Sequence, residues 1–147
     1  MAARPDTGLL ARSRIMTLRG EVQVSDLHPG AQVITRDSGT AVLRAIRRRR
    51  ITARRVRIRA RSLGHSRPDH DAILPAGQMI LIRDWRAQAL FGVARALVPA
   101  ARLADGEFVT ILGTAPMIVH DLEFDRPHAL YVDGLEVAST LAQPVTS

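Results

Sequence analysis

Short stretches in which apolar and polar residues alternate, separated by turn signals, make up most of the chain. Residues 15–24 predict two short strands joined at Arg19-Gly20, and residues 32–35 predict a strand that is closed by the turn Asp37-Ser38-Gly39. Residues 79–85 and 87–91 would pair as a hairpin, and the remaining predicted strands are at 41–46, 55–61, 108–112, 118–124 and 129–132. The pattern therefore predicts an all-β domain with minimal helix.

Few segments are predicted to be helical or to form long loops. Residues 25–30 and 99–103 have the pattern of a short helix or helical turn, and the polar residues 62–71 predict an exposed loop. No stretch is rich enough in Ser, Pro or Gly to separate two domains. The predicted division is a flexible leader, one domain and a tail, at residues 1–7, 8–140 and 141–147.

Composition agrees with a folded domain and restricts its chemistry. The 147 residues are 46% hydrophobic, which is enough for one core. No apolar run approaches the roughly 18 residues of a membrane helix, and the N-terminus lacks the apolar core of a signal peptide, so we expect a cytoplasmic location by default. The chain has no cysteine, so it can form neither a disulfide nor a thiolate metal site. We expect no cofactor.

The chain carries a net charge of +7, and all of its 21 basic residues are arginines. One interpretation of the dense run from Arg44 to Arg61 is a phosphate-binding stripe. The other is a strand with a solvated face, because arginines alternate with Val56, Ile58 and Ala60, and no aromatic residue interleaves to stack on bases. We favour the strand. The candidate polyanion contacts are Arg47, Arg48, Arg49, Arg50, Arg55, Arg57, Arg59 and Arg61.

Four segments, taken in order, resemble a known family. They are VSDLHPGAQVITRDSG from Val24, RIRARSLG from Arg57, LFGVARALVPAARLADG from Leu90 and VHDLEFDRPHALYVDG from Val119. Together they resemble the hedgehog/intein (Hint) family, specifically its bacterial branch. The resemblance implies a horseshoe of short strands whose halves are related by a pseudo-twofold. It also implies self-cleavage or splicing, in which an N-terminal cysteine attacks the preceding carbonyl in an N-to-S acyl shift.

The residues that would drive this cleavage are missing. Alignment by resemblance places the cysteine near Gly8, and Gly77 stands where family members carry the assisting histidine. Hydroxyls at Thr7 and Ser13 flank the first position. The His-Asn pair that completes splicing would fall near Ala138-Ser139 and is also absent.

The third family element is partly present. By resemblance, Asp121 and His128 match an aspartate and a histidine near the active centre, and His120 occupies a position where the bacterial branch often has histidine. These three are the candidate catalytic residues, in vestigial form. Without a nucleophile we favour a structural role, in which Asp121 and His128 hold strand ends through hydrogen bonds.

The sequence therefore predicts a degenerate Hint domain that acts as a folded or partner-binding module. Two alternatives are residual autoproteolysis through a hydroxyl near the N-terminus and an arginine-rich domain that binds nucleic acid or another polyanion. An unidentified protein partner and weak non-specific polyanion binding are compatible with this hypothesis, whereas membrane insertion is not expected. The oligomeric state is left open.

Overall fold

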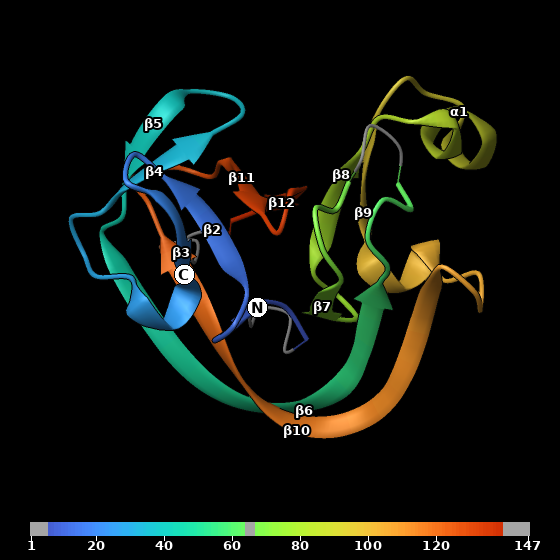
Figure 1. Cartoon of the computed structure of the whole chain (residues 1–147), viewed down its shortest axis with the longest axis horizontal. Coiled ribbons are helices and arrows are strands. Elements are labelled where there is room, and N and C mark those ends of the chain that lie inside the picture. The colour runs from blue at the N-terminus through green and yellow to red at the C-terminus, as the bar shows by residue number, and fades with distance from the viewer. Residues whose placement is uncertain (1–5, 64–66, 140–147) are drawn as a thin grey trace, which may run out of the picture.

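Two long antiparallel strands, β6 (Ala45–Ile58) and β10 (Val109–Glu123), define the architecture. The computed structural model describes residues 6–63 and 67–139. In it, β6 runs from one lobe to the other and β10 returns beside it, so the pair forms the curved base of a horseshoe (Figure 1). Each long strand starts in one lobe and ends in the other, as two pseudo-twofold halves would require. The predicted all-β horseshoe is confirmed.

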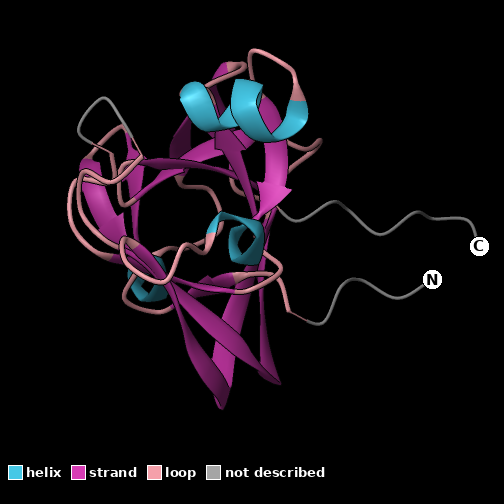
Figure 2. Ribbon diagram, turned by 90° about the vertical axis from the view of Figure 1, so that its right-hand side faces the viewer, coloured by secondary structure: helices cyan, strands magenta, loops and turns pink. Residues whose placement is uncertain are grey.

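Short strands build the lobes above this base. One sheet has the order β1-β10-β6-β7, and the other runs β3-β2-β4-β11-β12-β8-β9 with β5 added beside β4. Figure 2 shows the same strands from the side, with little helix. The short strands are β1 (Leu9–Leu10), β2 (Arg14–Thr17), β3 (Gly20–Gln23), β4 (Gln32–Thr35), β5 (Gly39–Val42), β7 (Ala72–Pro75), β8 (Met79–Ile82), β9 (Ala96–Pro99), β11 (Ala129–Val132) and β12 (Leu135–Ala138).

Helix within the described residues is limited to three short pieces, η1 (Val24–Asp26), α1 (Trp85–Phe91) and η2 (Ala100–Leu103). The prediction of a strand at residues 87–91 is wrong, because this segment is α1 and the hairpin partner of β8 is β9. Asp84 caps the helix by accepting a hydrogen bond from the Arg86 N–H at 3.0 Å, and Gly92 ends it in the left-handed conformation. None of these helices is long and apolar enough to cross a membrane.

The predicted strands at 41–46 and 55–61 have different bounds in the structure. Residues 39–42 form β5, while β6 continues without a break through the arginine run and ends at Ile58, before Arg59 and Arg61. Likewise, the predictions at 108–112 and 118–124 are parts of the single strand β10. The two long strands pair along their full length, and their hydrogen bonds keep the arginine run in a strand. The polar run alone does not predict these bounds.

The ribbon of β6 and β10 turns its buried face as it crosses between the lobes. Ile51 is buried in the first half of β6, whereas Val56 and Ile58, at positions of the opposite parity, are buried in the second half. A register shift between Ile111 and Gly113 of β10 lies at this change. Such a bulge increases local twist and bends a strand, which allows one ribbon to cover both lobes.

The β11–β12 hairpin closes through Asp133-Gly134, and both residues have positive φ, 52° and 82°. This is the pattern of a two-residue type I′ turn. The segment around Asp69 packs against the turn, since the Asp69 N–H donates to the Asp133 carbonyl at 3.0 Å. The predicted exposed loop at 62–71 is thus partly packed, with Leu63 and Pro68 buried. Residues 64–66, like the terminal residues 1–5 and 140–147, lie outside the described residues.

We predict that Gly134→Ala destabilises the domain more than Gly39→Ala. Both glycines have positive φ, so each alanine costs about 1–2 kcal/mol of backbone strain. A Cβ at Gly134 would also lie 2.8 Å from the Asp69 backbone nitrogen, while one at Gly39 meets nothing within 4 Å. Urea unfolding of both variants should show the larger loss for Gly134→Ala. Equal losses would mean that the Asp69 segment does not hold this turn.

Candidate functional site

The N-terminal strand β1 lies against β10, close to the turn that joins β7 and β8. Leu9 and Leu10 pair with His120 and Val119, which places Gly8 beside Asp121. The Gly77 N–H donates to the Asp6 carbonyl at 3.1 Å. The structure therefore brings together Gly8, Gly77 and Asp121, three positions that the sequence analysis placed in one centre.

Gln78 joins three strands at this centre through its side-chain amide. Its Oε1 accepts a hydrogen bond from the Gly8 N–H at 2.8 Å, and its Nε2 donates to the Ala138 carbonyl at 2.8 Å. The side chain is buried, and its bond to Gly8 lies away from water, while its bond to Ala138 is partly buried. Gln78 belongs to no motif in the sequence, and the only signal for it is that it is a polar residue between the apolar segments 72–76 and 79–82.

Arg49 provides the second fixed contact. Its Nε and Nη2 bind the carboxylate of Asp121 at 2.5 and 3.1 Å, and Nη2 also donates to the Thr7 carbonyl at 2.9 Å. Asp121 is buried, and two-pronged pairing with a guanidinium is the arrangement that best compensates a buried carboxylate. Arg49 was predicted as a polyanion contact, but the structure directs it inward.

Neither glycine position leaves space for a side chain in the present arrangement. Gly8 has a φ of +118°, and a Cβ there would lie 2.8 Å from the Val119 Cβ and 3.1 Å from Asp121 Oδ1. A Cβ at Gly77 would lie 2.2 Å from Asp6 Oδ1, so the Asp6 carboxylate fills the space that a side chain at this position would need.

The candidate catalytic residues divide between two places. His120 is buried beside β1, and its Nδ1 lies 3.1 Å from the Leu9 carbonyl, so a proton on Nδ1 makes a hydrogen bond that ties β1 to β10. His128 contacts other groups: its Nδ1 lies 2.9 Å from Asp37 Oδ2, and its ring meets Phe124 edge-on. Its N–H donates to Ser139 Oγ at 2.9 Å. The contacts of His128 thus join β11 to the β4–β5 turn and the end of β12.

Asp37 reinforces this second place. Partial burial raises the pKa of Asp37, but hydrogen bonds from the Ala129 N–H, the His128 ring and its own N–H outweigh that effect and hold the pKa below its usual range. The folded state therefore favours the ionised form of the Asp37 carboxyl group.

A third polar centre was not predicted. Glu136 is 1% exposed, yet Arg36 Nε lies 3.1 Å from its Oε1, and Arg83 Nη2 and Arg67 both pair with Oε2. The arginines come from the end of β4, the segment before β7 and the end of β8. The only sequence signal was a lone glutamate in the otherwise apolar strand LEVA.

The remaining arginines of the predicted polyanion stripe have different surroundings. Arg47 pairs with Glu123, and Arg55 is half-buried with its Nε out of contact with solvent. Exposed arginines of the stripe are Arg48, Arg50, Arg57, Arg59 and Arg61. Among the described residues, no group of three or more His, Asp or Glu side chains is placed to hold a metal ion.

Comparison with known proteins agrees with this geometry. The family model described as "Hint domain" matches residues 7–144. A DnaB intein from Synechocystis sp. PCC 6803 superposes with a TM-score of 0.63 at 12% identity, covering 91% of this chain and 99% of the intein. The bacterial intein-like domain from Clostridium thermocellum gives a TM-score of 0.58 at 14% identity, with coverages of 91% and 98%. No curated protein matches the chain in sequence.

These solved structures are too distant in sequence to show more than the fold. The family match, in contrast, extends over nearly the whole chain and includes Gly8, Gly77 and Asp121. The chain belongs to the Hint-domain family, with an intein-like fold and without cysteine.

Proposed function

We propose that this chain is a member of the bacterial Hint branch that no longer cleaves itself and serves as a folded, partner-binding module. In this proposal the former cleavage centre has a structural use, which is to hold the N-terminal segment against the domain. The observation that carries it is the binding of the Thr7–Gly8 peptide on both sides. Arg49 binds the Thr7 carbonyl, and Gln78 binds the Gly8 N–H.

Loss of the reaction follows from the groups at the centre. An N-to-S shift needs a thiol on the residue that follows the scissile carbonyl and a group that protonates the leaving amide. Position 8 carries no side chain, and position 77 carries no imidazole. The φ of Gly8 disfavours any L-residue there, and the amide is engaged by an acceptor, Gln78 Oε1, which supplies no proton.

One observation favours the alternative of residual autoproteolysis. The Asp6 carbonyl accepts a hydrogen bond from the Gly77 N–H, which would polarise it toward attack by the hydroxyl of Thr7. In that step Thr7 Oγ1 bonds to the Asp6 carbonyl carbon and the peptide C–N bond breaks. An ester forms, and the Thr7 nitrogen leaves as a free amine after taking a proton. A single donor is weak support for this reaction, so we rank it second.

We expect the purified full-length chain to keep its intact mass during long incubation, with or without hydroxylamine. Mass spectrometry would reveal an ester as a product that begins at Thr7 or Ser13 once hydroxylamine opens it. Such a product would contradict the proposal. Its disappearance in Thr7→Val or in Ser13→Ala would then identify which hydroxyl acts.

We also expect Arg49→Met to destabilise the domain far more than Arg47→Met, although the two arginines lie on the same strand. Removing Arg49 leaves the carboxylate of Asp121 buried without its guanidinium, which typically costs about 3–5 kcal/mol. Arg47 is 72% exposed and pairs with the more accessible Glu123, so its removal should cost about 1 kcal/mol or less. Chemical unfolding measures both. Similar losses of stability in the two variants would show that the contacts of Arg49 with Thr7 and Asp121 do not hold the centre together.

The pH dependence of stability should report the structural role of His128 and Asp37. Because the folded pKa of Asp37 lies below its ordinary value of 3.8, its contribution is complete above that pH and is lost as pH falls through the folded pKa. The stability difference between wild type and Asp37→Asn should therefore shrink as pH falls below about 4. Unfolding curves at several acidic pH values test this expectation. A difference independent of pH would argue against the hydrogen bonds that the Asp37 carboxylate accepts from Ala129 and His128.

A further inference from the structure

The middle of the β6–β10 ribbon is paired on one side only. Residues 50–53 of β6 pair with residues 115–118 of β10. The segment that contains β7 joins β6 only from Arg54 onward, where the Ala76 N–H donates to the Arg54 carbonyl, and β1 joins β10 only at Val119 and His120. In the described structure this stretch is therefore a two-stranded ribbon. Its bend forms the end of the molecule farthest from α1 (Figures 1 and 2).

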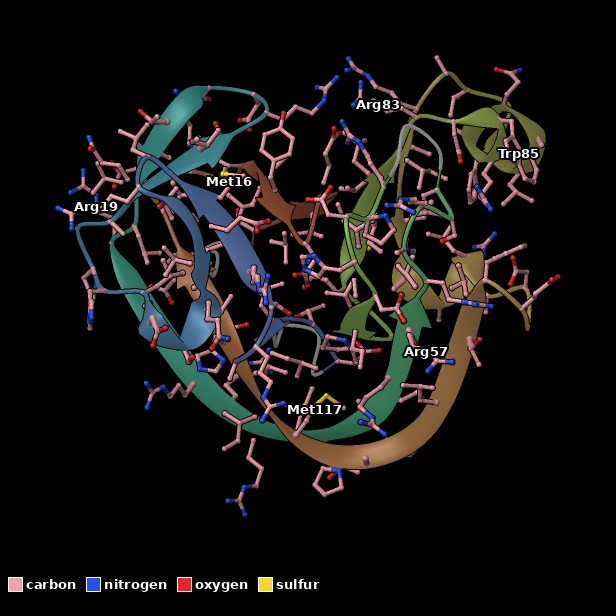
Figure 3. The ribbon with its side chains drawn as sticks, viewed as in Figure 1. Met16, Arg19, Arg57, Arg83, Trp85 and Met117 are labelled. Atoms are coloured by element: carbon pink, nitrogen blue, oxygen red, sulfur yellow. The ribbon has the colours of Figure 1, made fainter. Side chains whose placement is uncertain are left out.

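The pleat of the ribbon separates its two faces. Met117, opposite Ile51, points to the concave side (Figure 3). Successive side chains of a strand point to opposite faces, so Arg50 and Arg54, with their partners Ile118 and Thr114, point to the convex side. All four are exposed, and Arg48 continues the same row. We call Arg48, Arg50 and Arg54 the convex arginine row.

Within the described residues, no carboxylate neutralises the convex arginine row. The ten residues of β10 from Val109 to Ile118 contain no acidic residue. Farther along β10, Asp121 is taken by Arg49 and Glu123 by Arg47, and no ion pair in the described part of the chain reaches any member of the row. Three exposed, permanently charged guanidinium groups therefore project from a narrow, curved surface.

Shape and charge together indicate the partner. We propose that the convex arginine row binds the phosphate backbone of duplex DNA, with the two-stranded ribbon lying in a groove. The major groove of B-DNA is about 12 Å wide and admits a two-stranded β-ribbon. Arg50 and Arg54 lie about 13 Å apart along the strand, at a rise of about 3.3 Å per residue, which is far enough for each to contact a different, non-adjacent phosphate.

The surroundings of the row favour a duplex over a single strand. Ile118 and Thr114 lie opposite Arg50 and Arg54, and the ring opposite Arg48, that of His120, is buried. None of these partners offers an exposed aromatic ring on which a base could stack. Guanidinium groups bind phosphate oxygens in pairs irrespective of the base, so recognition would be independent of sequence. This activity is separate from the proposed loss of cleavage, and either can fail without the other.

The test compares two variants with the same reduction in charge. Arg48→Ala/Arg50→Ala/Arg54→Ala removes the row, and Arg12→Ala/Arg19→Ala/Arg95→Ala removes three exposed arginines from other parts of the surface. Fluorescence anisotropy with a labelled duplex of about 20 base pairs gives the affinity at several salt concentrations. Thermal unfolding verifies that both variants remain folded.

Wild type should bind the duplex, and the row variant should bind at least about tenfold more weakly, with a salt slope flatter by about 0.9 for each phosphate that is no longer neutralised. The control variant should stay near wild type. Substituting lysine for each arginine of the row should retain part of the affinity, because lysine keeps the charge but cannot grip a phosphate with two N–H groups in a fixed fork. Absence of duplex binding near physiological salt would overturn the proposal. So would equal weakening in both variants, or binding of single-stranded DNA or heparin as tight as that of the duplex.

Discussion

The antiparallel pairing of β6 with β10 determines where everything else in the molecule lies. The two strands are far apart in sequence, yet their register runs from Ala45 opposite Glu123 to Ile58 opposite Val109. That register places Arg49 beside Asp121 and leaves His120 free to pair with β1. It also joins both lobes to one curved ribbon. Long-range pairing of this kind carries a loop-closure cost in entropy, which the buried contacts at each end of the ribbon offset.

Catalytic centres usually keep polar groups strained or incompletely paired, at a cost in stability. The centre around Gly8 has the opposite character. The Gly8 N–H, the Thr7 carbonyl and the Asp121 carboxylate all have partners, and those partners are Gln78 and Arg49. Glycine at position 8 has no side chain that could act as a nucleophile, and it lets the N-terminal strand approach Val119 closely. The absence of a reactive side chain and the tight packing of the segment thus both follow from the same glycine.

Local signals predicted the short elements well and the long ones poorly. The strand at residues 32–35 and its hairpin turn follow from β-branched residues and Asp37-Ser38-Gly39, and the structure has both. Helix α1 could have been predicted from its Asp84 cap and Gly92, which were present but were outweighed by apolar content. The extent of β6 depends on pairing with distant residues, and nothing in the arginine run distinguishes the inward Arg49 from its neighbours. The contacts of Gln78 also depend on distant residues, so its role could not be predicted. Gly8, Gly77 and Asp121 could be placed together only through family resemblance.

A strand with four consecutive arginines is possible here because its pleat separates them. Alternation sends Arg49 to Asp121 on the concave side and Arg48 and Arg50 to water on the convex side. A slip of one residue would exchange the faces, which would bury two guanidinium groups against a single carboxylate and expose Ile51. Burying an uncompensated charge costs several kcal/mol, so the arginine run itself opposes the wrong register. The Arg49–Asp121 ion pair and the convex arginine row therefore both result from the register between β6 and β10. A change that shifts the register of β6 should disturb both together.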